Sequence, residues 1–265
     1  MEDTTNEPRK IQSVDRAVEL LESIQDHDGA TLTEIAEATG LSPGTVHTYL
    51  STLEDHCLVR KDIHEYYLGY RFVLAGEYVK NHNTLYRHGR KVVDNLANKT
   101  GESVHLIIED DGLEVILYES FGKDAVGIEF YIKNRENSDR YLHYSASGKA
   151  ILAHLPRSEV NNIIDKHGLM AKTPNTITNP DKLAAELETI QERGFAVNQQ
   201  EAVIGIRAVG APILDSQRDP IGAISISAPS SRLKRNTFVE EYPEAVMEAA
   251  NIIEVNVQTG ELYRE

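Results

Sequence analysis

Apolar positions along the chain follow two different spacings, and these divide it into two regions. In the first part they recur at helical intervals, as at Val46, Leu50 and Leu53, which would place them on one buried stripe of a helix. Beyond about residue 100, short β-rich runs alternate with helical stretches. The pattern therefore predicts a helical N-terminal region followed by a mixed region with a sheet.

Two helix-start signals lie only eleven residues apart in the first region. Thr31 and Glu34 form a capping box, in which each side chain satisfies a backbone N–H at the start of a helix. Gly40 suits the left-handed position that ends a helix, and Ser42 followed by Pro43 starts another. Two short helices joined by a tight turn are typical of a helix-turn-helix, whose second helix enters the DNA major groove. The alternative is an ordinary helical hairpin inside another fold.

The neighbouring residues favour the DNA-binding alternative. The spacing of apolar residues in 13–24 predicts another helix before these two. Its core-facing side is expected to be Val14, Ala17, Val18 and Leu21. Residues 58–61 and 66–69 predict two short strands around a polar tip at 62–65. Three helices with a small hairpin make a winged helix-turn-helix.

The rest of the chain predicts an α+β domain with a mostly antiparallel sheet. Residues 72–80 and 84–98 are expected to be helices separated by a break at 81–83. Asp111-Gly112 is a strong hairpin turn. The other strands and helices are expected at residues 104–108, 114–118, 126–132, 145–154, 156–166, 180–194, 196–199, 206–214, 221–227 and 239–257. We expect three parts: a DNA-binding domain at 1–72, a linker helix at 73–83 and a second domain at 84–265.

Length and composition limit the class of protein. The 265 residues suit one or two domains, and 40% are hydrophobic, which is enough for a real core. No apolar run is long enough to span a membrane, and the polar N-terminus has no signal-peptide segment. The single Cys57 cannot form an internal disulfide and is expected to be a small apolar filler. These features predict a cytoplasmic protein with no membrane partner.

Charge appears at first to argue against DNA binding. The net charge is −15, and residues 1–80 hold 15 acidic against 7 basic side chains. The predicted recognition helix has no Lys or Arg. Either the segment does not bind DNA, or the surface is acidic for solvation in a very salty cytoplasm. At high salt, counterion release contributes little, so binding would depend on shape and neutral contacts. The general acidity of the chain favours the second explanation.

Several motifs, in order, resemble the IclR family of transcriptional regulators over nearly the whole chain. The strings SVDRAVELLESI, GLSPGTVHTYLSTLEDHCLV and YYLGYRFVLAG resemble the family's first helix, recognition helix and wing. LHYSASGKAILAHLP and EAVIGIRAVGAPILDSQRDPIGAISISAP resemble its pocket loop and C-terminal signature. The resemblance implies an N-terminal winged helix-turn-helix and a C-terminal GAF-like effector-binding domain. It also implies a small-molecule effector and a dimer or a dimer of dimers.

The resemblance also suggests which residues bind DNA. A near-palindromic double-stranded operator is expected, with base contacts from the second helix and phosphate contacts from Arg60 and Lys61. Candidates at that helix are Ser42, Pro43, Gly44, Thr45, His47, Thr48 and Ser51. Position 48 is often Arg in the family, so Thr48 weakens any inference about which operator is bound.

The effector is expected to be a small organic or sugar-derived acid that controls a catabolic pathway. Ala146, Ser147 and Gly148 match the family's ligand-contacting loop, and helix starts bind anions. Ser225 and Ser227 alternate on one strand, so both hydroxyls can point to one face. The remaining candidates are Tyr131, Asn198, Ile206 and Ala208. The only Lys or Arg residues close to the 146–148 loop in sequence are Arg140 and Lys149, which favours a singly charged ligand.

The sequence around these residues does not match the known motifs for catalysis, metal binding or cofactor binding. A Ser-x-x-Lys nucleophile would need serine at Ala146, and a phosphate-binding loop would need glycine at His143 and a hydroxyl at Ala150. His105, His143 and His154 lack metal-type spacing and are expected to be structural or exposed, and Lys149 to pair structurally. The expectation is therefore a regulator without cofactor or metal. An enzyme with a helix-turn-helix appendage and a pure interaction module remain as alternatives.

Overall fold

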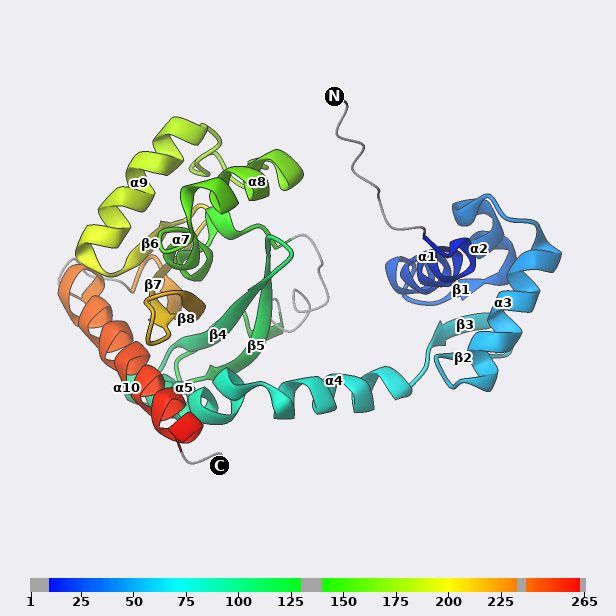
Figure 1. The fold of residues 1–265 in the computed structure, drawn as a ribbon, viewed down its shortest axis with the longest axis horizontal. Coiled ribbons are helices and arrows are strands. Elements are labelled where there is room, and N and C mark those ends of the chain that lie inside the picture. The colour runs from blue at the N-terminus through cyan, green and yellow to red at the C-terminus, as the bar shows by residue number, and fades with distance from the viewer. Residues whose placement is uncertain (1–9, 130–139, 233–236, 263–265) are drawn as a thin grey trace, which may run out of the picture. The chain divides into compact units, whose positions relative to one another are not determined.

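The computed structural model describes residues 10–129, 140–232 and 237–262. The chain divides into two compact units, Met1–Val79 and Lys80–Glu265 (Figure 1). No helix among the described residues combines the length and apolarity needed to cross a membrane.

The N-terminal unit is a winged helix-turn-helix. Its elements are α1 (Gln12–Asp26), β1 (Ala30–Thr31), α2 (Leu32–Thr39), α3 (Pro43–Asp55), β2 (Val59–Asp62) and β3 (Glu65–Leu68). The strands form an antiparallel sheet in the order β1-β3-β2. Its core contains Leu20, Ile24, Ile35, Val46, Leu50, Leu53, Val59 and Tyr66.

The predicted helix signals of this unit are confirmed. Thr31 and Glu34 form the reciprocal capping box, and Gly40 ends α2 at a φ of 65°. The Ser42 hydroxyl accepts a hydrogen bond from the Thr45 backbone N–H over 3.2 Å, with Pro43 as the first residue of α3. These local bonds fix the tight turn between α2 and α3.

Two sequence expectations for this unit were wrong. Val14 and Val18 are 56% and 46% exposed, whereas Leu20 and Ile24 are almost fully buried. The helix carries two overlapping apolar stripes, and the core uses the one that also contains Ala17 and Leu21. Cys57 is exposed rather than buried, because it lies in the turn after α3 with a φ of 57°.

Two helices follow in sequence. They are α4 (Arg71–His82), which has no buried residue, and α5 (Thr84–Thr100). Only Asn83 separates α4 from α5, so the break between the two helices is shorter than the predicted 81–83. The Asn83 side chain accepts a hydrogen bond from the Tyr86 N–H over 3.1 Å.

The second unit is a five-stranded antiparallel sheet with helices on both faces (Figure 1). The strands lie in the order β5-β4-β8-β7-β6: β5 (Leu113–Phe121), β4 (Ser103–Asp110), β8 (Pro220–Pro229), β7 (Ile206–Leu214) and β6 (Ala196–Gln199). One core packs α5 and α10 (Tyr242–Leu262) on one face of the sheet. A second core contains α7 (Ala146–Leu152), α8 (Arg157–His167) and α9 (Pro180–Arg193). Short turns η1 (Leu142–Tyr144) and η2 (Thr237–Glu241) precede α7 and α10.

The antiparallel α+β prediction is confirmed, apart from one strand. In the 126–132 segment, Val126 and Gly127 have no regular structure and the next two residues are helical, while the remainder lies outside the described residues. Among the described residues of this segment, 126–129, none pairs with β5, the edge strand on this side of the sheet.

Candidate functional site

A cavity of about 450 Å³ lies between the start of α7 and one face of the sheet. Seven of the nine sequence-predicted effector residues line it: Ala146, Ser147, Asn198, Ile206, Ala208, Ser225 and Ser227. Tyr131 lies outside the described residues. Gly148 does not line the cavity. Residues far apart in the sequence therefore meet at one hollow in the second unit.

Strand register explains why these residues converge. Ser227 pairs with Ser103 on β4 and with Ala208 on β7, and Ala208 pairs with Asn198 on β6. Residues paired across a sheet point to the same face, so this row forms part of the cavity floor. A second row contains Ser225, which pairs with His105 on β4 and Gly210 on β7.

Two glycines allow close packing around the start of α7, one against the sheet and one against η1. A Cβ at Gly210 would lie 2.9 Å from the Ala146 carbonyl carbon and 3.0 Å from the Ser147 nitrogen. A Cβ at Gly148 would lie 2.3 Å from the Leu142 carbonyl oxygen. Gly148 therefore permits close packing against η1, which is a different role from the ligand contact expected from sequence.

A buried carboxylate stands at the start of α7. The Glu114 side chain is 1% exposed and accepts hydrogen bonds from the Ser145 hydroxyl (2.9 Å), the Ser147 hydroxyl and Arg140 Nη2 (3.3 Å). The sequence predicted that an effector anion would bind at this helix start. Glu114 already places a negative charge there, so a second carboxylate at the same point would be repelled.

A second buried polar pair joins β4 to β5. His105 Nδ1 lies 3.0 Å from Glu119 Oε2, and the two side chains are 7% and 1% exposed. The His105 ring lines the cavity. His143 and His154 instead contact the backbone carbonyls of Met170 and Ala150, and burial lowers the pKa of both. Structural roles for the last two agree with the sequence expectation.

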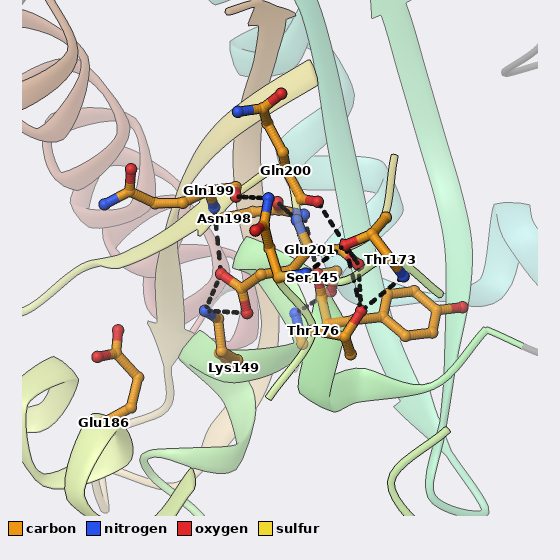
Figure 2. A network of polar contacts seen from close by, with 12 residues as sticks. Ser145, Lys149, Thr173, Thr176, Glu186, Asn198, Gln199, Gln200 and Glu201 are labelled. Carbon is orange, nitrogen blue, oxygen red and sulfur yellow. Dashed lines mark hydrogen bonds and ion pairs between the residues drawn. The ribbon is translucent and has the colours of Figure 1, made fainter. Parts of the chain in front are cut away.

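A polar network lies beside the cavity, and its members Asn198 and Thr173 line the cavity (Figure 2). Lys149 Nζ contacts both carboxylate oxygens of Glu201, at 2.7 and 2.8 Å, which confirms the predicted structural pairing of this lysine. Asn198 donates to the Tyr144 carbonyl (2.8 Å) and accepts from the Glu201 N–H (2.9 Å). The Thr173 hydroxyl donates to the Gln200 carbonyl over 2.8 Å. These bonds anchor the segment after β6, whose residues Ala202, Val203 and Ile204 also line the cavity.

Sequence reasoning missed eleven of the eighteen residues that line the cavity. The additional residues are His105, Ile107, Glu114, Arg140, Tyr144, Ser145, Lys172, Thr173, Ala202, Val203 and Ile204. Burial and the Glu114 charge raise the pKa of Tyr144 to about 12, so its hydroxyl stays protonated at neutral pH. A polar residue inside an otherwise apolar strand, such as His105, was the signal that could have found part of this set.

The predicted DNA-binding residues lie on α3 and the wing. Pro43, Gly44, His47, Thr48 and Ser51 are exposed, as is Ser42, and Thr45 is half-buried. The hydroxyls of Ser42 and Thr45 contact each other over 2.8 Å, and the Thr48 hydroxyl donates to the Gly44 carbonyl over 3.0 Å. His47 therefore presents the largest polar side chain on this uncharged face.

The wing carries the two predicted phosphate-binding cations. The Arg60 guanidinium lies 4.4 Å from the centre of the Tyr67 ring, and Lys61 Nζ lies 5.1 Å from that of Tyr66. Stacking on tyrosine limits the freedom of both side chains, and Lys61 remains exposed. Among the described residues, no group of three or more His, Cys, Asp or Glu could hold a metal ion.

Comparison with known proteins gives consistent matches in both units. The family model "Bacterial transcriptional regulator IclR C-terminal" matches residues 76–255, and "IclR helix-turn-helix domain" matches residues 13–62. The chain is 42% identical over 255 residues to ArcR of Halobacterium salinarum, described as a probable HTH-type transcriptional regulator; the match covers 96% of this chain and 97% of that protein.

Solved structures share the fold. The crystal structure of Thermotoga maritima IclR is similar with a TM-score of 0.71 and 31% identity, covering 94% of this chain and 99% of that one. An IclR homologue from Microbacterium hydrocarbonoxydans, complexed with 4-hydroxybenzoate, has a TM-score of 0.76 and 21% identity, covering 93% and 99%.

Proposed function

This chain belongs to the IclR family of DNA-binding transcriptional regulators, and from that premise we propose that it controls a catabolic pathway in response to a small organic or sugar-derived acid. The observation that carries the proposal is the cavity of about 450 Å³ in the effector-binding unit, with serine and asparagine side chains on its wall. The cavity is then a sensing site rather than a catalytic one, in a protein that acts on DNA in the cytoplasm.

The chemistry of the cavity supports an acidic effector. Its wall combines hydroxyl and amide groups with the cations Arg140 and Lys172. Arg140 is paired with Glu114, so the cavity suits one carboxylate better than a phosphate group. The Microbacterium homologue was solved with 4-hydroxybenzoate, which is an acid of this kind.

Changing both Ser225 and Ser227 to alanine is expected to weaken effector binding by about 1–3 kcal/mol, because buried hydrogen bonds to the ligand are lost. Calorimetry with 4-hydroxybenzoate and a panel of central-metabolism acids measures this. DNA binding by the ligand-free double variant should be unchanged, because the DNA-binding residues lie in the other unit. Ser158→Ala, on the exposed side of α8, is the matched control. Equal affinity of wild type and double variant would show that the serines are only sheet residues.

On the DNA side, we propose that α3 contacts bases in the major groove and that the wing contacts phosphates. Exposed His47, Thr48 and Ser51 support the first part, and Lys61 with Arg60 supports the second. Few cations are available, so binding would depend on shape and neutral hydrogen bonds more than on counterion release. A gel-shift assay at low and molar salt, with DNA from the protein's own gene neighbourhood, separates this proposal from an interaction module with a degenerate winged helix.

His47→Ala is expected to change sequence preference by about 1–3 kcal/mol at one base position, because base contacts specify sequence. Lys61→Ala should weaken binding to all sequences about equally, since phosphate contacts are independent of sequence. Binding to a library of single-base operator variants measures both, with Ser158→Ala as the control. A His47→Ala protein with unaltered affinity and preference would rule out α3 as the recognition helix.

The assembly we propose is a dimer or a dimer of dimers on a near-palindromic operator, since one winged helix contacts a single half-site. Helix α4 supports this. It has no buried residue, and its apolar side chains Val73, Leu74, Tyr78 and Val79 are 61–73% exposed. Such a surface on a soluble domain is typical of an interface.

A further inference from the structure

A second cavity, of about 860 Å³, lies along β6, the strand at one edge of the described sheet. It shares no described lining residue with the effector cavity. Strand alternation separates the two: Gln199 pairs with Arg207 beside this cavity, whereas Asn198 pairs with Ala208 beside the other. Successive residues of a strand point to opposite faces, so the β6–β7 pair contributes to one cavity on each face. The volume is in the range of small-molecule sites.

The charges around this second cavity do not balance. Its described lining residues include three cations and two carboxylates: Lys149, Arg193, Arg207, Glu186 and Glu201 (Figure 2). Lys149 pairs with Glu201, and Arg193 Nη2 lies 3.1 Å from Glu186 Oε1. These two pairs offset each other's charge. Arg207 is left as one uncompensated cation at the cavity, in a chain whose net charge is −15.

The Arg207 side chain is held in place without a counter-ion. Its guanidinium carbon lies 5.2 Å from the centre of the ring of Phe238, a buried residue that also lines the cavity. This contact positions the planar group. Within the described ranges, no carboxylate or carbonyl oxygen accepts a hydrogen bond from the Arg207 side chain, and its Nε is buried without a partner. The two terminal nitrogens form a fork that fits a carboxylate.

The rest of the wall suits an apolar body attached to that carboxylate. Apolar and aromatic side chains contribute Ile177, Phe195, Val197 and Phe238. The Phe195 ring is covered by the Arg193 guanidinium at 4.8 Å, and Arg193 Nε donates to the Phe195 carbonyl over 2.6 Å. Arg193 is thus occupied by Glu186 and Phe195, so Arg207 is the cation that remains to bind an anion.

We propose that this cavity is a second small-molecule site, which binds a monocarboxylate with an apolar body. The terminal nitrogens of Arg207 bind the carboxylate, and Phe195 and Phe238 contact the body. The single uncompensated charge favours one carboxylate over a dicarboxylate or a phosphate. This site is additional to the effector cavity, and the proposal does not depend on what the effector cavity binds.

Calorimetry on the full-length protein with benzoate and its neutral analogue benzamide tests the site. The background is the Ser225→Ala, Ser227→Ala double variant, in which binding at the effector cavity is weakened. Adding Arg207→Met is expected to weaken benzoate binding about 10- to 100-fold, because the charged hydrogen bonds are lost, and to leave benzamide binding unchanged. A general disturbance of the cavity would weaken both probes alike.

Two further variants complete the series. Arg207→Lys keeps the charge but not the planar fork, so a smaller loss of benzoate affinity is expected. It also serves as the test variant if Arg207→Met does not fold. Arg157→Met is the matched control, because it removes an exposed arginine at the first residue of α8, and it should leave benzoate binding unchanged.

Crystals of the full-length protein grown with 4-bromobenzoate locate the probe through the anomalous signal of bromine. A bromine in the cavity beside Arg207 is expected in wild type and not in Arg207→Met. If bromine is found only in the effector cavity, or if benzoate affinity does not depend on Arg207, the proposal is overturned. A bromine beside Arg207 without that dependence means binding at crystal concentration only. Arg207-dependent binding with an empty effector cavity would support this site and count against the proposed function.

Discussion

Lys149→Ala is expected to lower the free energy of unfolding of the effector-binding unit by about 3–5 kcal/mol, because it breaks a buried ion pair by removing one partner. The Lys149 side chain is 1% exposed, and its Nζ contacts both oxygens of the Glu201 carboxylate. Without the lysine, a carboxylate whose side chain is 6% exposed loses the cation that compensates it. The Gln199 N–H, 3.1 Å from Glu201 Oε1, cannot replace that charge.

Urea unfolding followed by circular dichroism measures the loss. Lys166→Ala is the matched control, because Lys166 pairs with Asp111 while both side chains are largely exposed, and such pairs contribute about 0–1 kcal/mol. A double variant, Lys149→Met with Glu201→Leu, removes both charges and should recover most of the stability. If Lys149→Ala loses no more than Lys166→Ala, the pair does not stabilise the unit as its burial indicates.

The elements that the sequence predicted well are those fixed by local chemistry. The capping box at Thr31 and Glu34, the serine cap at Ser42 and the Asp111-Gly112 turn depend on residues three or fewer positions apart. Such bonds form in the same way in almost any tertiary setting. The buried side of α1 was missed because both of its apolar stripes have helical spacing, and only packing against α2 and α3 selects between them.

The candidate site likewise contains some residues that local sequence patterns could place and others that they could not. Ser225 and Ser227 could be placed on one face from the two-residue period of a strand. Glu114 could not, because it reaches the start of α7 through contacts with Ser145 and Ser147 more than 30 residues away in the chain. His105 meets Glu119 through the register of β4 with β5, which the sequence does not specify. Long-range pairing, rather than residue type, determines this part of the cavity.

Leu74→Lys is expected to weaken operator binding by about 100- to 10,000-fold, because it should separate a dimer into monomers that each contact one half-site. Leu74 and Tyr78 on α4, with Tyr70 directly before the helix, recur every four residues and are 73%, 65% and 74% exposed, so they form one apolar stripe. A lysine at its centre would have to bury a charge against the partner helix, which is strongly unfavourable. The substitution leaves the cores of both units unchanged, since α4 has no buried residue.

Light scattering gives the mass of the wild type and the variant, and gel shift with an upstream DNA fragment that wild type binds gives the affinity. Met170→Lys is the matched control: it makes a similar apolar-to-lysine change at a side chain that is 54% exposed in the effector-binding unit. We expect Met170→Lys to keep the wild-type mass and affinity. A Leu74→Lys protein that retains both would exclude the α4 stripe as the dimer contact. A variant that stays dimeric but loses operator affinity would mean that the effector-binding units hold the dimer together, and that α4 serves only to align the two winged helices on the operator.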